Sequence, residues 1–239
     1  MSIVIYRCIR VDHQSVSLFS NVFINILGKG LHTKSMSVCL KRAHGKTTEN
    51  MFPCTQPLHK TCLSSRVRII KTIRTKMPVA RKLLEELPNL KIVHLVRDPR
   101  AVLQSQSHLG KCNTGHGGIE GCTNRLCIDL ENNLVEEELI MRDYPNRILP
   151  VLYEEIAKRP IETSQKLYEF AGYEFTDTIK EYVFNTTLAG EGNTYSYSTK
   201  RSNSSEHVDN WKNTMNPEFR NYVQTRCNYI IKHYKYELV

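Results

Sequence analysis

The sequence lacks the motifs of several common functional classes. Its cysteines form no C-x-x-C pair, which argues against a zinc site. No G-x-x-x-x-G-K-[ST] motif is present, and the stretch Gly28-Lys29-Gly30 does not fit that pattern. There is also no RNP-type aromatic motif and no zinc-finger spacing. These absences disfavour P-loop phosphotransferases and predict no nucleic-acid partner.

Long hydrophobic runs are missing as well. The apolar stretch at residues 16–27 is interrupted by serines and asparagines and is too short to cross a bilayer. Residues 1–10 lack the charged region followed by an apolar run that is typical of a signal peptide. We therefore expect no membrane span in this chain.

Cysteine, in contrast, is abundant. The sequence contains 8 cysteines, at positions 8, 39, 54, 62, 112, 122, 127 and 227. This number predicts an oxidising, secretory compartment with some disulfides. The tripeptides Asn185-Thr186-Thr187 and Asn203-Ser204-Ser205 fit glycosylation in that compartment. Because no entry signal accompanies these features, we interpret the chain as an N-terminally incomplete version of a longer protein.

Length and composition are those of a globular domain. The 239 residues suit one α/β domain, and 40% hydrophobic and 24% charged residues are ordinary values. The net charge of +9 agrees either with a generally basic surface or with an anionic partner such as a nucleotide or an acidic glycan.

Hydrophobic periodicity predicts alternating strands and helices. Strands are expected at residues 2–6, 67–71, 91–96 and 147–153, and helices at 79–87, 101–108, 127–143, 161–171 and 218–234. Residues 110–121 and 189–205 are predicted to be loops. This order indicates an α/β fold with a parallel sheet flanked by helices, in which ligands bind at the carboxyl ends of the strands.

One strand end carries the residues of an anion site. Arg97 follows the buried strand at 91–96, Asp98 and Pro99 suit a helix start, and Ser105 lies about two turns into that helix. Helix amides, a forked guanidinium and a hydroxyl together favour a phosphate group. The alternative is that Arg97 pairs with Asp98 or with a carboxylate of the core.

Around this site the sequence resembles the carbohydrate sulfotransferases, most closely the Golgi enzymes that sulfate the 6-position of N-acetylglucosamine or galactose. The segments that carry the resemblance are residues 68–74 (RIIKTIR), 95–102 (LVRDPRAV), 152–156 (LYEEI), 167–172 (LYEFAG) and 198–205 (STKRSNSS), together with Trp211. They extend from about residue 67 to the C-terminus.

The resemblance implies a single sulfotransferase domain over residues 1–239, with a P-loop-like parallel sheet, located in the Golgi lumen. It also implies transfer of a sulfuryl group from 3′-phosphoadenosine 5′-phosphosulfate (PAPS) to a hydroxyl of a glycan on a glycoprotein or proteoglycan, without a metal. Arg97 and Ser105 would bind the 3′-phosphate, Lys71 would stabilise the leaving group, and Arg201 and Ser202 would close over the nucleotide. A disulfide is expected in the region of Cys112, Cys122 and Cys127.

Residues 1–66 match the family poorly. Family members bind the 5′-phosphosulfate with a loop of arginine, glycine and serines, whereas residues 10–15 (RVDHQS) contain no glycine and an aspartate that would repel the anion. The alternative is therefore a catalytically defective domain that binds a nucleotide or an anionic glycan. No general base is assigned among Glu131, Glu137, His108 and His116.

Overall fold

The computed structural model describes residues 2–5, 39, 54, 64, 69–73, 75–112, 117–187, 205 and 208–239. The chain divides into two compact units, one comprising Met1–Ile5 and Ile70–Val239 and the other Tyr6–Ile69. The apolar stretch at residues 16–27 and residues 189–204 of the predicted loop lie outside the described residues.

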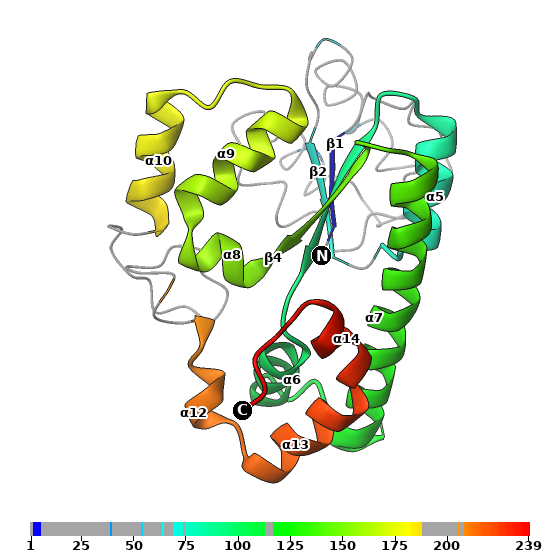
Figure 1. Cartoon of the computed structure of the whole chain (residues 1–239), viewed down its shortest axis with the longest axis vertical. Coiled ribbons are helices and arrows are strands. Elements are labelled where there is room, and N and C mark those ends of the chain that lie inside the picture. Colours follow the sequence, from blue (N-terminus) through cyan, green and yellow to red (C-terminus); the bar gives the residue numbers. More distant parts are fainter. Residues whose placement is uncertain are drawn as a thin grey trace. The chain divides into compact units, whose positions relative to one another are not determined.

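From β2 to β4 the described strands and helices follow one another in the order that the sequence predicts, and a series of helices follows β4 (Figure 1). The described elements are β1 (Ser2–Ile5), β2 (Ile69–Thr72), α5 (Met77–Glu86), β3 (Lys91–Val96), α6 (Pro99–His108), α7 (Gly118–Asp143), β4 (Ile148–Leu152), α8 (Tyr153–Lys158), α9 (Pro160–Ala171), α10 (Asp177–Thr187), α12 (Trp211–Thr214), α13 (Pro217–Arg226) and α14 (Asn228–His233).

The four described strands form one sheet in the order β2-β1-β3-β4. β3 and β4 are parallel, as predicted, and Val96 is paired with Leu152 at their carboxyl ends. β1 is antiparallel to β3, so the prediction of a parallel sheet is wrong for this pair. A short apolar strand satisfies its hydrogen bonds in either direction, and its sequence therefore does not specify which one it takes.

Helix α7 connects the sheet to a cluster of C-terminal helices. It contacts β4 and α5 and also α6, α13 and α14 (Figure 1). It begins at Gly118, nine residues before the predicted start at residue 127, within the segment expected to be a loop. The disulfide from Cys122 to Cys112 holds this first part of the helix, so tertiary contacts outweigh the low helix propensity of its glycines.

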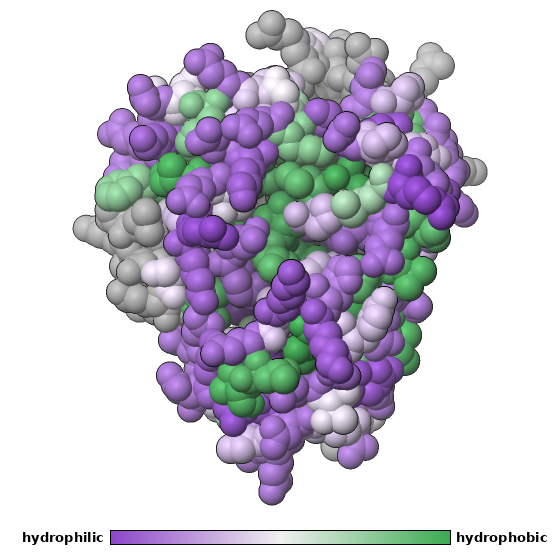
Figure 2. Space-filling view, viewed as in Figure 1, coloured by the Kyte–Doolittle hydropathy of each residue, from purple (hydrophilic) through white to green (hydrophobic). Residues whose placement is uncertain are grey.

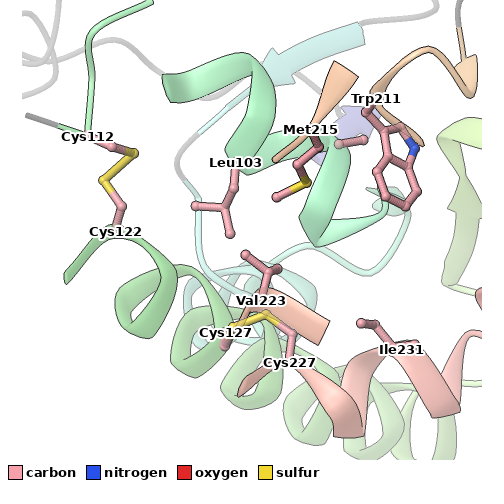
Figure 3. Close-up of a cluster of buried hydrophobic side chains, with 10 residues drawn as sticks. Leu103, Cys112, Cys122, Cys127, Trp211, Met215, Val223, Cys227 and Ile231 are labelled. Atoms are coloured by element: carbon pink, nitrogen blue, oxygen red, sulfur yellow. A yellow bond between two sulfur atoms is a disulfide. The ribbon is translucent and has the colours of Figure 1, made fainter. Parts of the chain in front are cut away.

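The buried core beside α7 includes two disulfides (Figure 3). Cys112–Cys122 and Cys127–Cys227 lie among Leu103, Trp211, Met215, Val223 and Ile231. The single helix predicted at 218–234 is broken at Cys227 into α13 and α14, and this break lets residues of both helices enter the same core. Hydrophilic side chains cover most of the face seen in Figure 2.

Candidate functional site

The turn between β3 and α6 is built as the sequence predicts. Asp98 is the N-cap of α6, its side chain accepts a hydrogen bond of 2.8 Å from the backbone N–H of Arg100, and Pro99 occupies the first helical position. Proline fits there because the missing N–H has no helical partner to lose. The helix therefore begins two residues after Arg97.

The same cap removes backbone amides from anion binding. Pro99 has no N–H, the N–H of Arg100 is bound by Asp98, and the N–H of Asp98 donates to Glu154 Oε1 at 3.0 Å. The sequence predicted that unpaired amides of this helix start would bind an anion. Those three positions offer none, so recognition of an anion at this turn depends chiefly on side chains.

Arg100 is the partner of Asp98. Its Nε and a terminal nitrogen donate to the two carboxylate oxygens at 3.1 and 2.8 Å, and its guanidinium lies 4.5 Å from the Trp211 ring. It also donates to Gln224 Oε1 and to the Glu237 carbonyl. The sequence left open an ion pair between Arg97 and Asp98. Among the described residues, Asp98 pairs with Arg100 instead.

Arg97 lies in a different environment, at the carboxyl edge of the parallel pair. Because Val96 and Leu152 are in register, Arg97 and Tyr153 leave their strands at the same level. The Arg97 Cζ lies 4.5 Å from the centre of the Tyr153 ring. Its Nε is buried and has no hydrogen-bond partner in the described structure. An unsatisfied buried donor costs about 1–3 kcal/mol, so this atom favours an acceptor from a ligand.

Glu154, in the first turn of α8, supports the turn between β3 and α6. It accepts the Asp98 N–H and, at 3.4 Å, the hydroxyl of Tyr236. Burial raises the pKa of Glu154, whereas the bond from Asp98 opposes this shift. Burial and the Glu154 carboxylate raise the pKa of Tyr236. Sequence reasoning did not assign Tyr153 and Glu154 to the site, although their position directly after a predicted parallel strand is a signal for them.

The other residues predicted to form the site do not lie at the β3–α6 turn itself. Ser105 is exposed in α6, about 9 Å along the helix axis from its first residue. Lys71 is exposed on β2, and β1 separates that strand from β3, a spacing of about 10 Å. Arg201 and Ser202 lie outside the described residues.

The residues considered as general bases have structural contacts. Glu137 is buried, bonded to His94 Nδ1 and, at 3.2 Å, to the Tyr234 hydroxyl. Glu131 pairs with Arg226 at 3.1 Å. His108 lies 3.3 Å from Gln104 Nε2. His116 is not among the described residues.

The part of the chain that the structure describes lacks two further features. No group of three or more histidine, cysteine, aspartate or glutamate side chains in that part of the chain is arranged to hold a metal ion. None of its helices combines the length and the apolar character needed to cross a membrane.

Comparison with curated proteins finds carbohydrate sulfotransferases. The chain is 29% identical to carbohydrate sulfotransferase 3 of Tetronarce californica over 194 residues, which are 75% of this chain and 44% of that protein. It is 29% identical to carbohydrate sulfotransferase 3 of Homo sapiens over 195 residues, which are 75% of this chain and 40% of that protein. It is 26% identical to carbohydrate sulfotransferase 1 of Danio rerio over 198 residues, which are 75% of this chain and 46% of that protein. The chain thus spans less than half the length of these relatives. No solved structure matches it.

A family model described as a sulfotransferase domain matches residues 29–235, beginning ahead of residue 67, where the recognised motifs start. This range contains β3, α6 and β4, and therefore the whole turn that carries Arg97. With most of its length matched in this way, the chain belongs to the sulfotransferase domain family.

Proposed function

We propose that this chain is a carbohydrate sulfotransferase domain that transfers a sulfuryl group from PAPS to a glycan hydroxyl. The observation that carries the proposal is the arginine at the carboxyl edge of the parallel strands, whose buried Nε lacks an acceptor. The named relatives are carbohydrate sulfotransferases, which supports a glycan of a glycoprotein or proteoglycan as the acceptor.

In this proposal Arg97 and Ser105 bind the 3′-phosphate of the donor. The guanidinium supplies the charge and directed N–H donors, and the serine hydroxyl adds one more hydrogen bond. Arg201 and Ser202 are proposed to cover the nucleotide. No metal is needed for this binding, because the cationic side chains neutralise the anion.

The chemical step exchanges one sulfur–oxygen bond for another. The acceptor hydroxyl oxygen bonds to sulfur, the bond from sulfur to the 5′-phosphate oxygen breaks, and 3′-phosphoadenosine 5′-phosphate (PAP) leaves. The hydroxyl proton passes to a base that remains unassigned. Lys71 is proposed to stabilise the charge that builds up on the leaving phosphate, as cations do in phosphoryl transfer.

The test measures PAP binding and transfer of labelled sulfate to N-acetylglucosamine and galactose acceptors. Arg97→Ala should weaken PAP binding about 10- to 100-fold, because hydrogen bonds to charged groups contribute about 1.5–3 kcal/mol and 1.4 kcal/mol is a factor of ten. Arg142→Ala is the matched control, since Arg142 is exposed at the end of α7. Unchanged binding and transfer in Arg97→Ala would refute the site.

The same assay distinguishes an active sulfotransferase from a catalytically defective domain. Wild-type protein that binds PAP or heparin but transfers no sulfate would be a catalytically defective domain. Phosphoryl transfer that requires magnesium would instead point to a kinase-like site that depends on a metal.

We place this activity in the Golgi lumen. Among the described residues, the disulfides Cys39–Cys54, Cys112–Cys122 and Cys127–Cys227 agree with an oxidising compartment. Asn185 of the first sequon is exposed on α10, whereas Asn203 lies outside the described residues.

Glycosylation of Asn185 provides a measurement of this location. Treatment with an N-glycosidase should increase the gel mobility of the protein made in animal cells, and Asn185→Gln should remove part of that shift. A mobility that the enzyme does not change would argue against passage through the secretory pathway.

A further inference from the structure

The amides at the start of α6 leave an anion little to bind. Asp98 and Glu154 already accept the N–H groups of Arg100 and Asp98, and Pro99 has none. A phosphate at this turn must therefore be recognised mainly by the side chain of Arg97. The orientation of that side chain becomes decisive for affinity.

Fixing an arginine side chain on an anion has an entropic cost. The long side chain has about 2 kcal/mol of rotamer entropy that binding would remove. In this structure the Tyr153 ring already holds the guanidinium, with Cζ 4.5 Å from the ring centre. Such a cation–π contact leaves the N–H donors at the guanidinium edge available to an anion.

The backbone next to Arg97 is supported by Glu154, which follows Tyr153 in the first turn of α8. Glu154 accepts the N–H of Asp98 at 3.0 Å and the hydroxyl of Tyr236 at 3.4 Å. Tyr153 and Glu154 are the first two residues of α8, and they directly follow Leu152, which pairs with Val96 at the end of the β3–β4 register. One residue thus contacts the side chain of the arginine while its neighbour fixes the turn.

We infer that Tyr153 and Glu154 are positioning residues for Arg97, and that the Tyr153 ring makes this side chain selective for the 3′-phosphate of the donor nucleotide. The inference rests on the proposed function. It assigns to the start of α8, directly after β4, a part in donor recognition that acts through Arg97 rather than by contact with the nucleotide.

The experiment compares affinities for PAP and for adenosine 5′-phosphate, which lacks the 3′-phosphate. Tyr153→Leu should weaken PAP binding about 3- to 30-fold, the range that a cation–π contact of ~0.5–2 kcal/mol implies. It should leave the affinity for adenosine 5′-phosphate unchanged. Tyr153→Phe keeps the ring and should recover most of the loss. Tyr182→Leu, at an exposed tyrosine of α10, is the control.

Glu154 is tested in the same assay. Glu154→Gln retains an oxygen that can accept the Asp98 N–H, whereas Glu154→Ala does not. We expect the alanine variant to lose more PAP affinity than the glutamine variant, again without an effect on adenosine 5′-phosphate. Equal losses for both nucleotides would indicate general damage to the fold and would overturn the inference.

A double-mutant cycle separates this inference from the function it rests on. In the Arg97→Ala background, Tyr153→Leu should cause no further loss of PAP affinity, because the ring acts through the arginine. If Arg97→Ala itself has no effect, the proposed function fails. If Arg97→Ala weakens binding and Tyr153→Leu in the wild-type background does not, only the inference fails.

Discussion

Two arginines three positions apart have different roles. Arg100 is 1% exposed and bonded to Asp98, Gln224 and Glu237, whereas Arg97 is half-buried and has a donor without an acceptor. Arg100 therefore joins α6 to the C-terminal segment. Arg97 is the one of the two that is suited to a ligand.

The Arg100–Asp98 pair yields a stability prediction. Arg100→Met leaves the Asp98 carboxylate, itself 3% exposed, without its charged partner. Breaking a buried ion pair from one side costs about 3–5 kcal/mol. We expect a loss of that size in the free energy of unfolding, measured with urea.

Two further variants keep this prediction testable even when Arg100→Met does not fold. Arg100→Met combined with Asp98→Asn removes both charges and should be less destabilised than the single change. Arg142→Met, at a 70% exposed side chain, should change the free energy of unfolding by less than about 0.5 kcal/mol. If Arg100→Met had the same free energy of unfolding as the wild-type protein, the Arg100–Asp98 pair would not stabilise the fold.

At the scale of elements, local signals identified the parts next to the site. The apolar run of β3 and the Asp98-Pro99 start of α6 were predicted at their observed positions. The end of α9 at Gly172 was also predicted, and this glycine has the left-handed φ of 81° that favours it there. These features depend on residues close together in sequence, so the sequence is sufficient for them.

Elements that depend on distant contacts were missed. α8 and α10 were not predicted, and α10 has no buried residue that would give it a clear apolar face. The Tyr153–Arg97 contact joins the two residues that directly follow the paired strands β3 and β4. The sequence predicted Arg97 as a site residue, but it did not predict that the Tyr153 ring contacts its side chain.

At the scale of the whole molecule, the Cys127–Cys227 disulfide connects α7 to the junction of α13 and α14 over a sequence separation of 100 residues. In the chain-entropy model, closing a loop of this length stabilises the fold by about 4.7 kcal/mol. Replacing both cysteines by alanine should therefore lower the free energy of unfolding by about 2–5 kcal/mol, measured with urea under oxidising conditions.

The Cys112–Cys122 disulfide is the internal comparison. Its separation is 10 residues, and the same model gives a stabilisation below about 3 kcal/mol. Removing it should destabilise the protein less than removing Cys127–Cys227. The reverse order would show that packing around the sulfur atoms, rather than loop length, sets the stability.

The sequence by itself determined the family, the β3–α6 turn and the arginine it presents, because these follow from contiguous motifs and short-range hydrogen bonding. Only the tertiary structure decided which cysteines pair, that β1 runs antiparallel, and that Glu154 and Asp98 use amides of the turn while Tyr153 supports Arg97. These features arise between segments far apart in the chain, where strand register and packing, rather than local residue pattern, fix the geometry.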